Sequence, residues 1–283
     1  MLKSFVIFVL LAAVIIGAGC HPSTPPLTNN PTPIATPIPT STPVELDPSL
    51  FIPLLRQVSE PFDQFYGNEI EPLHAEIHWF YDPNQSLTDA NTAPCPDFKC
   101  ANIYLSRIPN ADEGNASLDK DAFIVAHELA SLVIGPMLQN NEVLHCDNGQ
   151  LGDRFVDMLR TPLRDHRLAK YGFDLENNFQ SDLDGFTSFC DNPTDPLVVN
   201  IGAFIYAKLA LYWQYVLGHD DIPTELDSYC QRCWPICGQE GLDILAMING
   251  VGALENITPD KAHTLYQQII DEYSVSCWLV KTK

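Results

Sequence analysis

The spacing of apolar and polar positions predicts a short strand-forming region followed by a series of helices. Apolar side chains recur along one stripe of residues 48–66, which predicts an opening helix. Two strand-like segments follow, at 74–81 and 101–108, and a loop rich in Pro, Asp and Asn separates them. After that the pattern is helical, and we expect helices at about 119–138, 151–171, 196–217, 240–250 and 259–273. This order predicts an α+β fold in which a small N-terminal sheet precedes a mainly helical part.

The segment 196–217 is apolar enough to raise the question of a membrane-spanning helix. Lys208 lies near its centre, where a lysine would cost about 2.5–3.5 kcal/mol in a bilayer, and the flanking residues are acidic instead of basic. We therefore expect this segment to be a central helix of the protein core.

The first residues have the three parts of a secretory signal. Lys3 supplies a positive charge, an apolar run of about a dozen residues extends from Phe5 to Ile16, and small residues follow. The run is too short to span a bilayer of about 30 Å as a helix. We therefore predict that residues 1–19 are a cleaved signal peptide.

The small residues end on Cys20, and this ending resembles the lipobox of bacterial lipoproteins. It departs from the lipobox at Gly17, where a leucine or a similar residue is usual. The resemblance implies that the Cys20 thiol receives a lipid and becomes the mature N-terminus, which would anchor the chain in a membrane at the cell surface. The alternative is ordinary cleavage near Ala18 or Gly19, which would leave a free thiol at Cys20.

A polar segment at 20–47 separates this anchor from the rest of the chain. It is dominated by Pro, Thr, Ser and Asn, and it contains few large apolar side chains. Such a segment cannot bury enough surface to offset the entropy of folding, and repeated prolines keep it extended. We expect a disordered tether here and one globular domain at 48–283, because no second linker or repeat interrupts the remainder.

The chain carries 15 basic and 36 acidic residues, a formal net charge of −21. A field of this sign repels nucleic acid and anionic lipid headgroups, and it favours cationic partners. Nucleic-acid binding is therefore excluded as a function. The partners that we expect are the membrane, reached through the N-terminal lipid, and a protein or peptide ligand whose identity the sequence leaves open.

Nine cysteines are present, and eight remain once Cys20 is set aside. An even number in an exported chain suits up to four disulfides, whose pairing the sequence leaves open. Two of them flank one loop and suit a local bridge, and three are closely spaced and could instead bind a metal with the last cysteine as fourth ligand. The loop pair is Cys95 and Cys100, the spaced cluster is Cys230, Cys233 and Cys237 with Cys277, and the others are Cys146 and Cys190.

The candidate chemistry lies in the expected helix 119–138, where His127 and Glu128 follow an apolar lead. The pair resembles the H-E-x-x-H motif of zincin metallopeptidases, in which two histidines four residues apart bind zinc and the glutamate activates water. The strand region before this helix also matches the order of elements in zincins. The resemblance implies a zincin-like domain with zinc as cofactor, His127 as a metal ligand and Glu128 as the catalytic base. The chain departs from the motif at Ser131, which stands where the second histidine should be.

The following segment offers replacements for the lost ligand. Related zincins take a further ligand from a later helix or turn, and here Asp153 and Asp157 lie one helical turn apart on one face. Either carboxylate would point at His127 if its helix packs antiparallel to the previous one. His145 and His166 are the candidates for the missing imidazole.

Three classes of function follow from these observations. The first is a cell-surface lipoprotein whose zincin-like domain has lost catalysis and acts in binding or structure. The alternatives are an active metal-dependent peptidase with atypical ligands and a surface protein unrelated to peptidases. Ser131 separates the first class from the second, because a neutral hydroxyl is a poor zinc ligand beside imidazole. Zinc is thus the cofactor that the motif implies, and the missing histidine argues against its retention.

Overall fold

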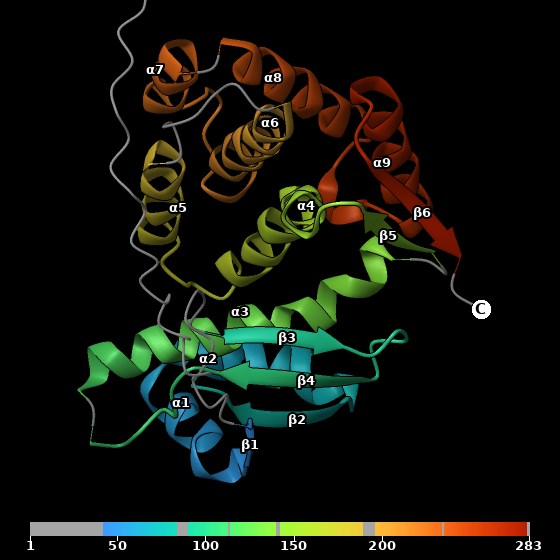
Figure 1. The fold of residues 1–283 in the computed structure, drawn as a ribbon. Helices are drawn as coiled ribbons and strands as arrows, with labels where there is room; N and C mark the ends of the chain where they lie inside the picture. Colours follow the sequence, from blue (N-terminus) through green and yellow to red (C-terminus); the bar gives the residue numbers. More distant parts are fainter. Residues whose placement is uncertain are drawn as a thin grey trace, which may run out of the picture. The chain divides into compact units, whose positions relative to one another are not determined.

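The computed structural model describes residues 42–83, 90–112, 114–139, 142–188, 196–233 and 235–281. All of them belong to the compact unit formed by Thr40–Lys283, and Figure 1 shows their arrangement. The expected signal peptide, Cys20 and most of the expected tether lie outside the described residues.

A four-stranded mixed sheet forms the N-terminal layer. Its strands, in spatial order, are β1 (Val44–Leu46), β2 (Glu76–Tyr81), β4 (Cys100–Leu105) and β3 (Ala90–Pro94). β2 and β4 run parallel with Trp79 opposite Ile103, and each outer strand pairs antiparallel with its neighbour. Trp79, Ile103 and Leu105 are buried in the core, as the alternation along a sheet covered on one face requires.

Both predicted strands are confirmed within a few residues, whereas the two outer strands of this sheet and the later strands at 142–146 and 277–281 were not predicted. β3 lies in the segment expected to be a loop, because the sequence Ala90-Asn-Thr-Ala-Pro94 has few β-branched or aromatic side chains and is held by its backbone pairing with β4. β1 lies within the expected tether. The predicted tether end at residue 47 is therefore wrong, since residues 44–46 already pair with β2.

The single opening helix expected at 48–66 is also wrong. The segment forms a 3-10 turn (η1, Pro48–Leu50), α1 (Ile52–Val58) and α2 (Glu60–Phe65), followed by a π-helical turn (η2, Tyr66–Ile70) and a second 3-10 turn (η3, Glu71–Leu73). The break falls at Ser59, whose backbone is extended with φ −121° and ψ 104°. Pro61 explains it, because a proline inside a continuous helix lacks a hydrogen-bond donor and clashes with the carbonyl four residues earlier. The apolar stripe is nevertheless buried in the same core as the sheet.

α3 (Asn115–Leu138) is the central helix, with the sheet on one side and α4 (Gly149–Ala169) on the other (Figure 1). It contributes to two apolar cores: Val125 and Leu129 pack with the sheet and the N-terminal helices, and Ile134 and Leu138 pack with the later helices. In the part of the chain that the structure describes, α3 is the one helix long and apolar enough to cross a membrane, by length and composition. Because 61% of its most apolar window is buried within the domain, α3 has the surroundings of a core helix.

The C-terminal half is a layer of helices closed by a two-stranded ribbon. Its helices are α5 (Glu176–Ser188), α6 (Pro196–Leu211), α7 (Thr224–Cys233), α8 (Pro235–Gly250) and α9 (Pro259–Tyr273), with a π-helical turn η5 (Tyr212–Val216) after α6 and a 3-10 turn η6 (Leu254–Asn256) before α9. The ribbon pairs β5 (Glu142–Cys146) antiparallel with β6 (Cys277–Lys281). The α+β class is thus confirmed.

The five helices expected from the pattern are all present within a few residues, whereas α5 and α7 were not predicted. α5 was missed because its buried apolar residues Phe179, Leu183 and Phe186 lie among polar residues that resemble an acidic loop. The core position of α6 is confirmed. Lys208, the residue that argued against a membrane span, is 9% exposed and donates to Asp182 of α5 at 2.5 Å.

Two disulfides are present among the described residues. Cys95 pairs with Cys100, as their loop suggested, and Cys146 pairs with Cys277 across the ribbon. A metal site with Cys277 as fourth ligand is therefore wrong, because this sulfur is bonded to Cys146. Outside the described part of the chain lie Cys190 and the side chains of Cys230, Cys233 and Cys237.

Candidate functional site

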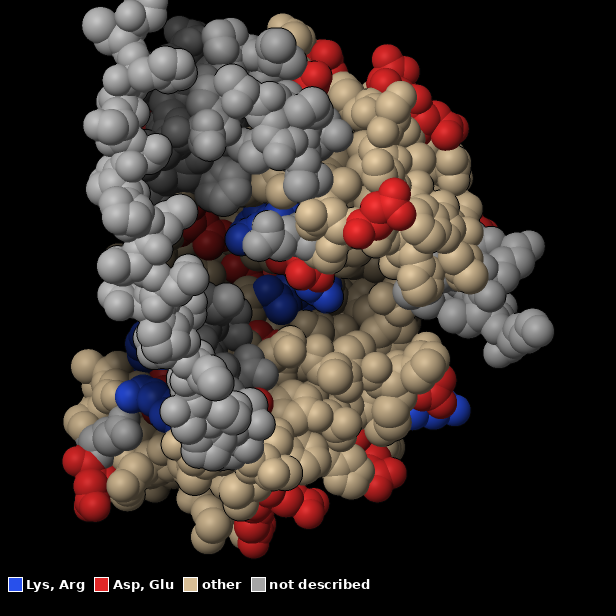
Figure 2. Space-filling model, viewed as in Figure 1, with Lys and Arg blue, Asp and Glu red and all other residues tan. Residues whose placement is uncertain are grey.

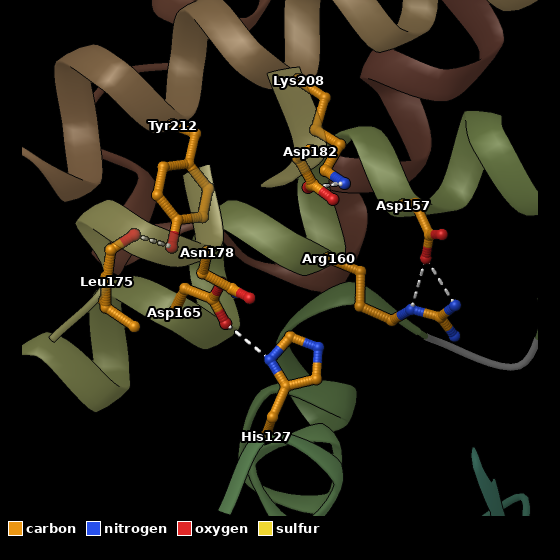
Figure 3. A network of polar contacts seen from close by, with 9 residues as sticks. All are labelled: His127, Asp157, Arg160, Asp165, Leu175, Asn178, Asp182, Lys208 and Tyr212. Atoms are coloured by element: carbon orange, nitrogen blue, oxygen red, sulfur yellow. Dashed lines mark hydrogen bonds and ion pairs between the residues drawn. The ribbon is translucent and has the colours of Figure 1, made fainter. Parts of the chain in front are cut away.

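α3 and α4 pack antiparallel and bring the His-Glu segment against the last turns of α4. His127 meets Asp165, and Ser131, further along α3, meets Arg164, earlier on α4. Asp165 Oδ1 lies 2.8 Å from His127 Nδ1, and Figure 3 shows the imidazole pointing from α3 toward this carboxylate. The antiparallel packing on which that prediction depended is present, but a different acid faces His127.

Asp165 is the most deeply buried charge of the site. Its side chain is 0% exposed, against 19% for His127, and Asn178 of α5 donates to its second oxygen at 3.3 Å. Burial raises the pKa of Asp165, but the charge and hydrogen bond of His127, with the charge of Arg164, outweigh burial and hold that pKa below its usual value. Burial and this neighbouring carboxylate raise the pKa of Tyr212. Asp165 is thus an ionised carboxylate in the interior.

Neither Asp153 nor Asp157 is the acid that contacts His127, so that expectation is wrong. His127 lies about 16 Å before the end of α3, so an antiparallel partner must lie at least as far into α4. Asp153 and Asp157 lie only about 6 and 12 Å into α4, whereas Asp165 lies about 24 Å into it. The lengths of α3 and α4 therefore pointed to Asp165. The sequence analysis missed it because it asked only which carboxylates share one face of the helix.

Asp157 is held by a neighbour on its own helix. Arg160 donates from Nε and Nη2 to Asp157 Oδ1, at 3.2 and 2.6 Å (Figure 3). Burial raises the pKa of Asp157, but the charge of Arg160, its hydrogen bond and more distant cations lower that pKa by more. Asp153 is exposed to solvent. Both predicted carboxylate ligands are therefore engaged elsewhere or turned outward.

Glu128, the predicted catalytic base, is held against the sheet. The hydroxyl of Thr92 on the edge strand β3 donates to Glu128 Oε2 at 2.6 Å, and the Glu128 backbone carbonyl lies 3.2 Å from the same hydroxyl. The sequence could not point to Thr92, because β3 itself was not predicted.

Ser131 faces a guanidinium group. Nη1 of Arg164 donates to Ser131 Oγ at 3.2 Å, and the two residues are 8% and 9% exposed. Nε of Arg164 has no hydrogen-bond partner among the residues that the structure describes. A permanent positive charge therefore lies beside Ser131, the residue that stands where the zincin motif has its second histidine. The sequence contained one indication of this charged surface. The spacing of Asp157, Arg160 and Arg164 puts all three on one face of α4.

The two histidines proposed as replacements also have other partners. His166 donates from Nδ1 to the backbone carbonyl of Tyr215 at 3.0 Å and stacks on that ring, with 4.0 Å between centroids. His145 stacks on Trp278 in the ribbon, with centroids 6.4 Å apart. The proposal that one of them supplies the missing imidazole therefore stays a prediction, and His145 lines the same pocket as Ser131.

The free energy of unfolding is expected to fall as pH drops below about 6.5, the ordinary pKa of histidine. Burial lowers the pKa of His166, although the hydrogen bond to the Tyr215 carbonyl opposes this shift. A lowered pKa means that the unfolded chain takes up the proton first. His166 therefore stabilises the fold fully above about pH 6.5 and progressively less as pH falls toward its folded pKa.

Urea denaturation at several pH values between about 7.5 and 5 measures this slope. His166→Asn keeps a donor near the position of Nδ1 and removes the titration, so this part of the slope should disappear. A variant with the same slope as the parent would show that another group is responsible.

The residues around His127 do not suit a zinc ion. The hydrogen bond from Nδ1 to a carboxylate is the contact that zinc-bound histidines commonly make, because it leaves Nε2 for the metal. A catalytic zinc site normally takes three protein ligands, however, and the described residues contain no group of three His, Cys, Asp or Glu side chains placed to hold a metal ion. Arg164 and Arg160 add positive charge on the face of α4 that meets α3.

A pocket of about 340 Å³ lies beside Ser131, between α3, α4, α9, β3 and the ribbon. The loop closed by Cys95–Cys100 sends Phe98 into its wall, where the ring packs on Gly135. A Cβ at Gly135 would lie only 2.0 Å from this ring, so the close approach requires glycine. Figure 2 shows the molecule hollowed between the layer of the sheet with α3 and the layer of later helices, and basic side chains lie in this hollow beside acidic ones.

No protein-family model, no curated protein and no solved structure matches the chain. The likeness to zincins therefore rests on His127 and Glu128, on their position in α3 and on the sheet before that helix.

Proposed function

We propose that the chain is an exported, lipid-anchored protein whose zincin-like domain has lost metal-dependent hydrolysis and acts by binding a ligand. The observation that supports this most is the contact of Arg164 with Ser131. Ser131 offers a hydroxyl where the zincin motif has a metal-binding histidine, and Arg164 places a positive charge beside that hydroxyl. Arginine keeps its charge at any pH that the protein tolerates, so this cation and a zinc ion would repel each other.

Most polar groups around His127 have partners within the protein chain. Asp165 and Asp157 are the negative groups, and Arg164 and Arg160 are the positive groups on the same helix. A buried charge is tolerated when it is paired and hydrogen-bonded, and the His127–Asp165 contact meets that requirement. This cluster supports a structural role, the joining of α3 to α4, for residues that a zincin uses in catalysis.

The proposed location rests on the N-terminal segment and on the disulfides. The signal-like residues 1–19 and the lipobox-like ending at Cys20 favour export and lipidation. Two disulfides, of which one joins β5 to β6, suit an oxidising compartment outside the cytoplasm.

An active metal-dependent peptidase is the second candidate, and one observation favours it. Asp165 orients His127 through Nδ1, which leaves Nε2 available in the manner of a zinc ligand. This candidate requires Arg164 to leave Ser131 and a further ligand to approach, so it needs a rearrangement that the first proposal does not.

Zinc analysis and peptide hydrolysis test the proposal. The chain carrying Cys20→Ser lacks the proposed lipid site and can be purified without detergent. After equilibration with a zinc buffer it is expected to hold substoichiometric zinc and to cleave no peptide. Ser131→His alone should bind zinc no better, because Arg164 still occupies the position. Ser131→His combined with Arg164→Met should bind zinc about 10–100-fold more tightly than Ser131→His, the usual size of effects from groups around a metal site.

Two results would overturn the proposal. One is stoichiometric zinc in the parent chain together with proteolysis that Glu128→Gln abolishes, which would establish the active peptidase. The other is strong zinc binding by Ser131→His alone, which would show that Arg164 does not block the site. The matched control is Arg154→Met, since Arg154 is exposed on the same helix.

A further inference from the structure

The pocket beside Ser131 has an apolar wall with polar groups at both ends. Its apolar wall comes from four different elements and from the loop that carries Phe98. The side chains are Phe98, Ile134, Leu138, Leu144, Val156 and Leu279. Ser131 and Leu138 both line it and lie about 10 Å apart along α3, so the pocket follows about two turns of this helix.

One end is formed by Thr92, Ser131, Arg160 and Tyr266. Thr92, Arg160 and Tyr266 line this pocket together, and Thr92 also donates to Glu128. Ser131 and Tyr266 are 9% and 6% exposed. At the other end of the wall Gln139, which lines the pocket, is exposed, and so is Asp153. Ser131 and Tyr266 therefore mark the inner end, and the half-exposed Arg160 lies at its edge.

One buried donor that lines the pocket has no partner among the described residues, and a partly exposed cation lies at the same end. The Tyr266 hydroxyl is buried and has no hydrogen-bond partner in the described part of the chain. Arg160 uses Nε and Nη2 on Asp157, and its side chain is 41% exposed, so the guanidinium can contact a bound molecule as well as Asp157. Leaving a buried donor unpaired costs about 1–3 kcal/mol, so such a group usually has a partner that the protein chain does not supply. The missing partner must accept hydrogen bonds.

We infer that this pocket binds the carboxylate of a medium-chain fatty acid, with its chain along the apolar wall. The inference rests on the proposed function, because it takes the domain to work by binding. Arg160 provides the positive charge for the carboxylate, and Tyr266 donates the second hydrogen bond. The side chains of Ile134, Leu138 and Leu279 offer an apolar surface on which an acyl chain can pack. A volume of about 340 Å³ is in the range of small-molecule sites.

Titration calorimetry on the Cys20→Ser chain with dodecanoate, decanoate and octanoate tests the inference. Dodecanoate is expected to bind at one molecule per chain. Affinity should fall about fourfold for each methylene removed, the value of burying one methylene group. Dodecanol should bind about tenfold more weakly or worse than dodecanoate, because it lacks the charge that Arg160 recognises.

Two variants test the inner end separately. Tyr266→Phe should weaken dodecanoate binding about three- to tenfold and should not lower the melting temperature of the free chain, because the removed hydroxyl had no partner. Arg160→Gln should weaken binding of dodecanoate by about tenfold or more and binding of dodecanol little. Arg154→Gln, on the exposed face of α4, is the matched control and should change neither.

The inference is overturned if no alkanoate binds, if dodecanol binds as tightly as dodecanoate, or if a short peptide with an apolar C-terminus binds while dodecanoate does not. It is also overturned if Tyr266→Phe lowers the melting temperature and leaves the affinity unchanged, since the hydroxyl would then serve the fold. These results are distinct from a failure of the proposed function, which appears as stoichiometric zinc and peptide hydrolysis whether or not alkanoates bind.

Discussion

Replacing Asp165 with alanine is expected to lower the free energy of unfolding by about 3–5 kcal/mol. Asp165 is completely buried and contacts His127, and its charge offsets that of the buried Arg164. Removing the carboxylate leaves an uncompensated guanidinium in the interior and a ring nitrogen without its partner. Urea denaturation at pH 7 measures the loss.

Two further variants separate charge from volume at this position. Asp165→Asn keeps the size and one hydrogen bond, so we expect a smaller loss than for alanine. Asp153→Asn, on the exposed face near the start of α4, should stay within about 0.5 kcal/mol of the parent. If Asp165→Ala were no more destabilising than Asp153→Asn, the His127–Asp165 contact would not join α3 to α4 as described.

The pH dependence of the free energy of unfolding is a further test of the Asp165 contact. The pKa of Asp165 is lower in the folded chain than in the unfolded one, so its contribution is complete above about pH 4. It is lost as pH falls through the lower, folded pKa. In Asp165→Asn this acid part of the stability curve should shrink, at a pH well below the one at which His166 acts.

Replacing both Cys146 and Cys277 with serine is expected to cost about 5 kcal/mol, the second large effect. The two residues are 131 positions apart in the chain, and the entropy that a cross-link removes from the unfolded state grows with the length of the closed loop. Cys95→Ser with Cys100→Ser is the control, because that loop spans five positions and should cost only about 2 kcal/mol. Equal losses in the two double variants would contradict this account.

Replacing both Cys146 and Cys277 with serine should also affect the pocket. Cys146 lines it, and Gly152 at the start of α4 packs so closely that a Cβ there would lie 3.2 Å from the Cys146 sulfur. Loosening β5 from β6 should therefore weaken dodecanoate binding as well as stability. Loss of the Cys95–Cys100 bridge should act on the pocket through Phe98 alone, and more weakly.

The sequence by itself determined the elements whose signals are local. Pro259 in the first turn of α9 and the Thr258 cap, which accepts from the Lys261 backbone, mark the start of this helix, and its observed bounds match the expected ones. The apolar spacing of α3 placed His127 and Glu128 on a buried central helix. Composition likewise indicated a cysteine-rich, acidic domain behind a polar tether.

Only the tertiary structure decided which groups these elements bring together. Asp165 reached His127 because the lengths of α3, β5 and α4 set the register of two antiparallel helices, and Arg164 reached Ser131 for the same reason. Cys146 pairs with Cys277 because β5 and β6, which lie at opposite ends of the C-terminal half of the sequence, form one ribbon. Periodicity and capping act over a few residues, whereas these contacts join positions 33–131 residues apart, and their partners are chosen by packing.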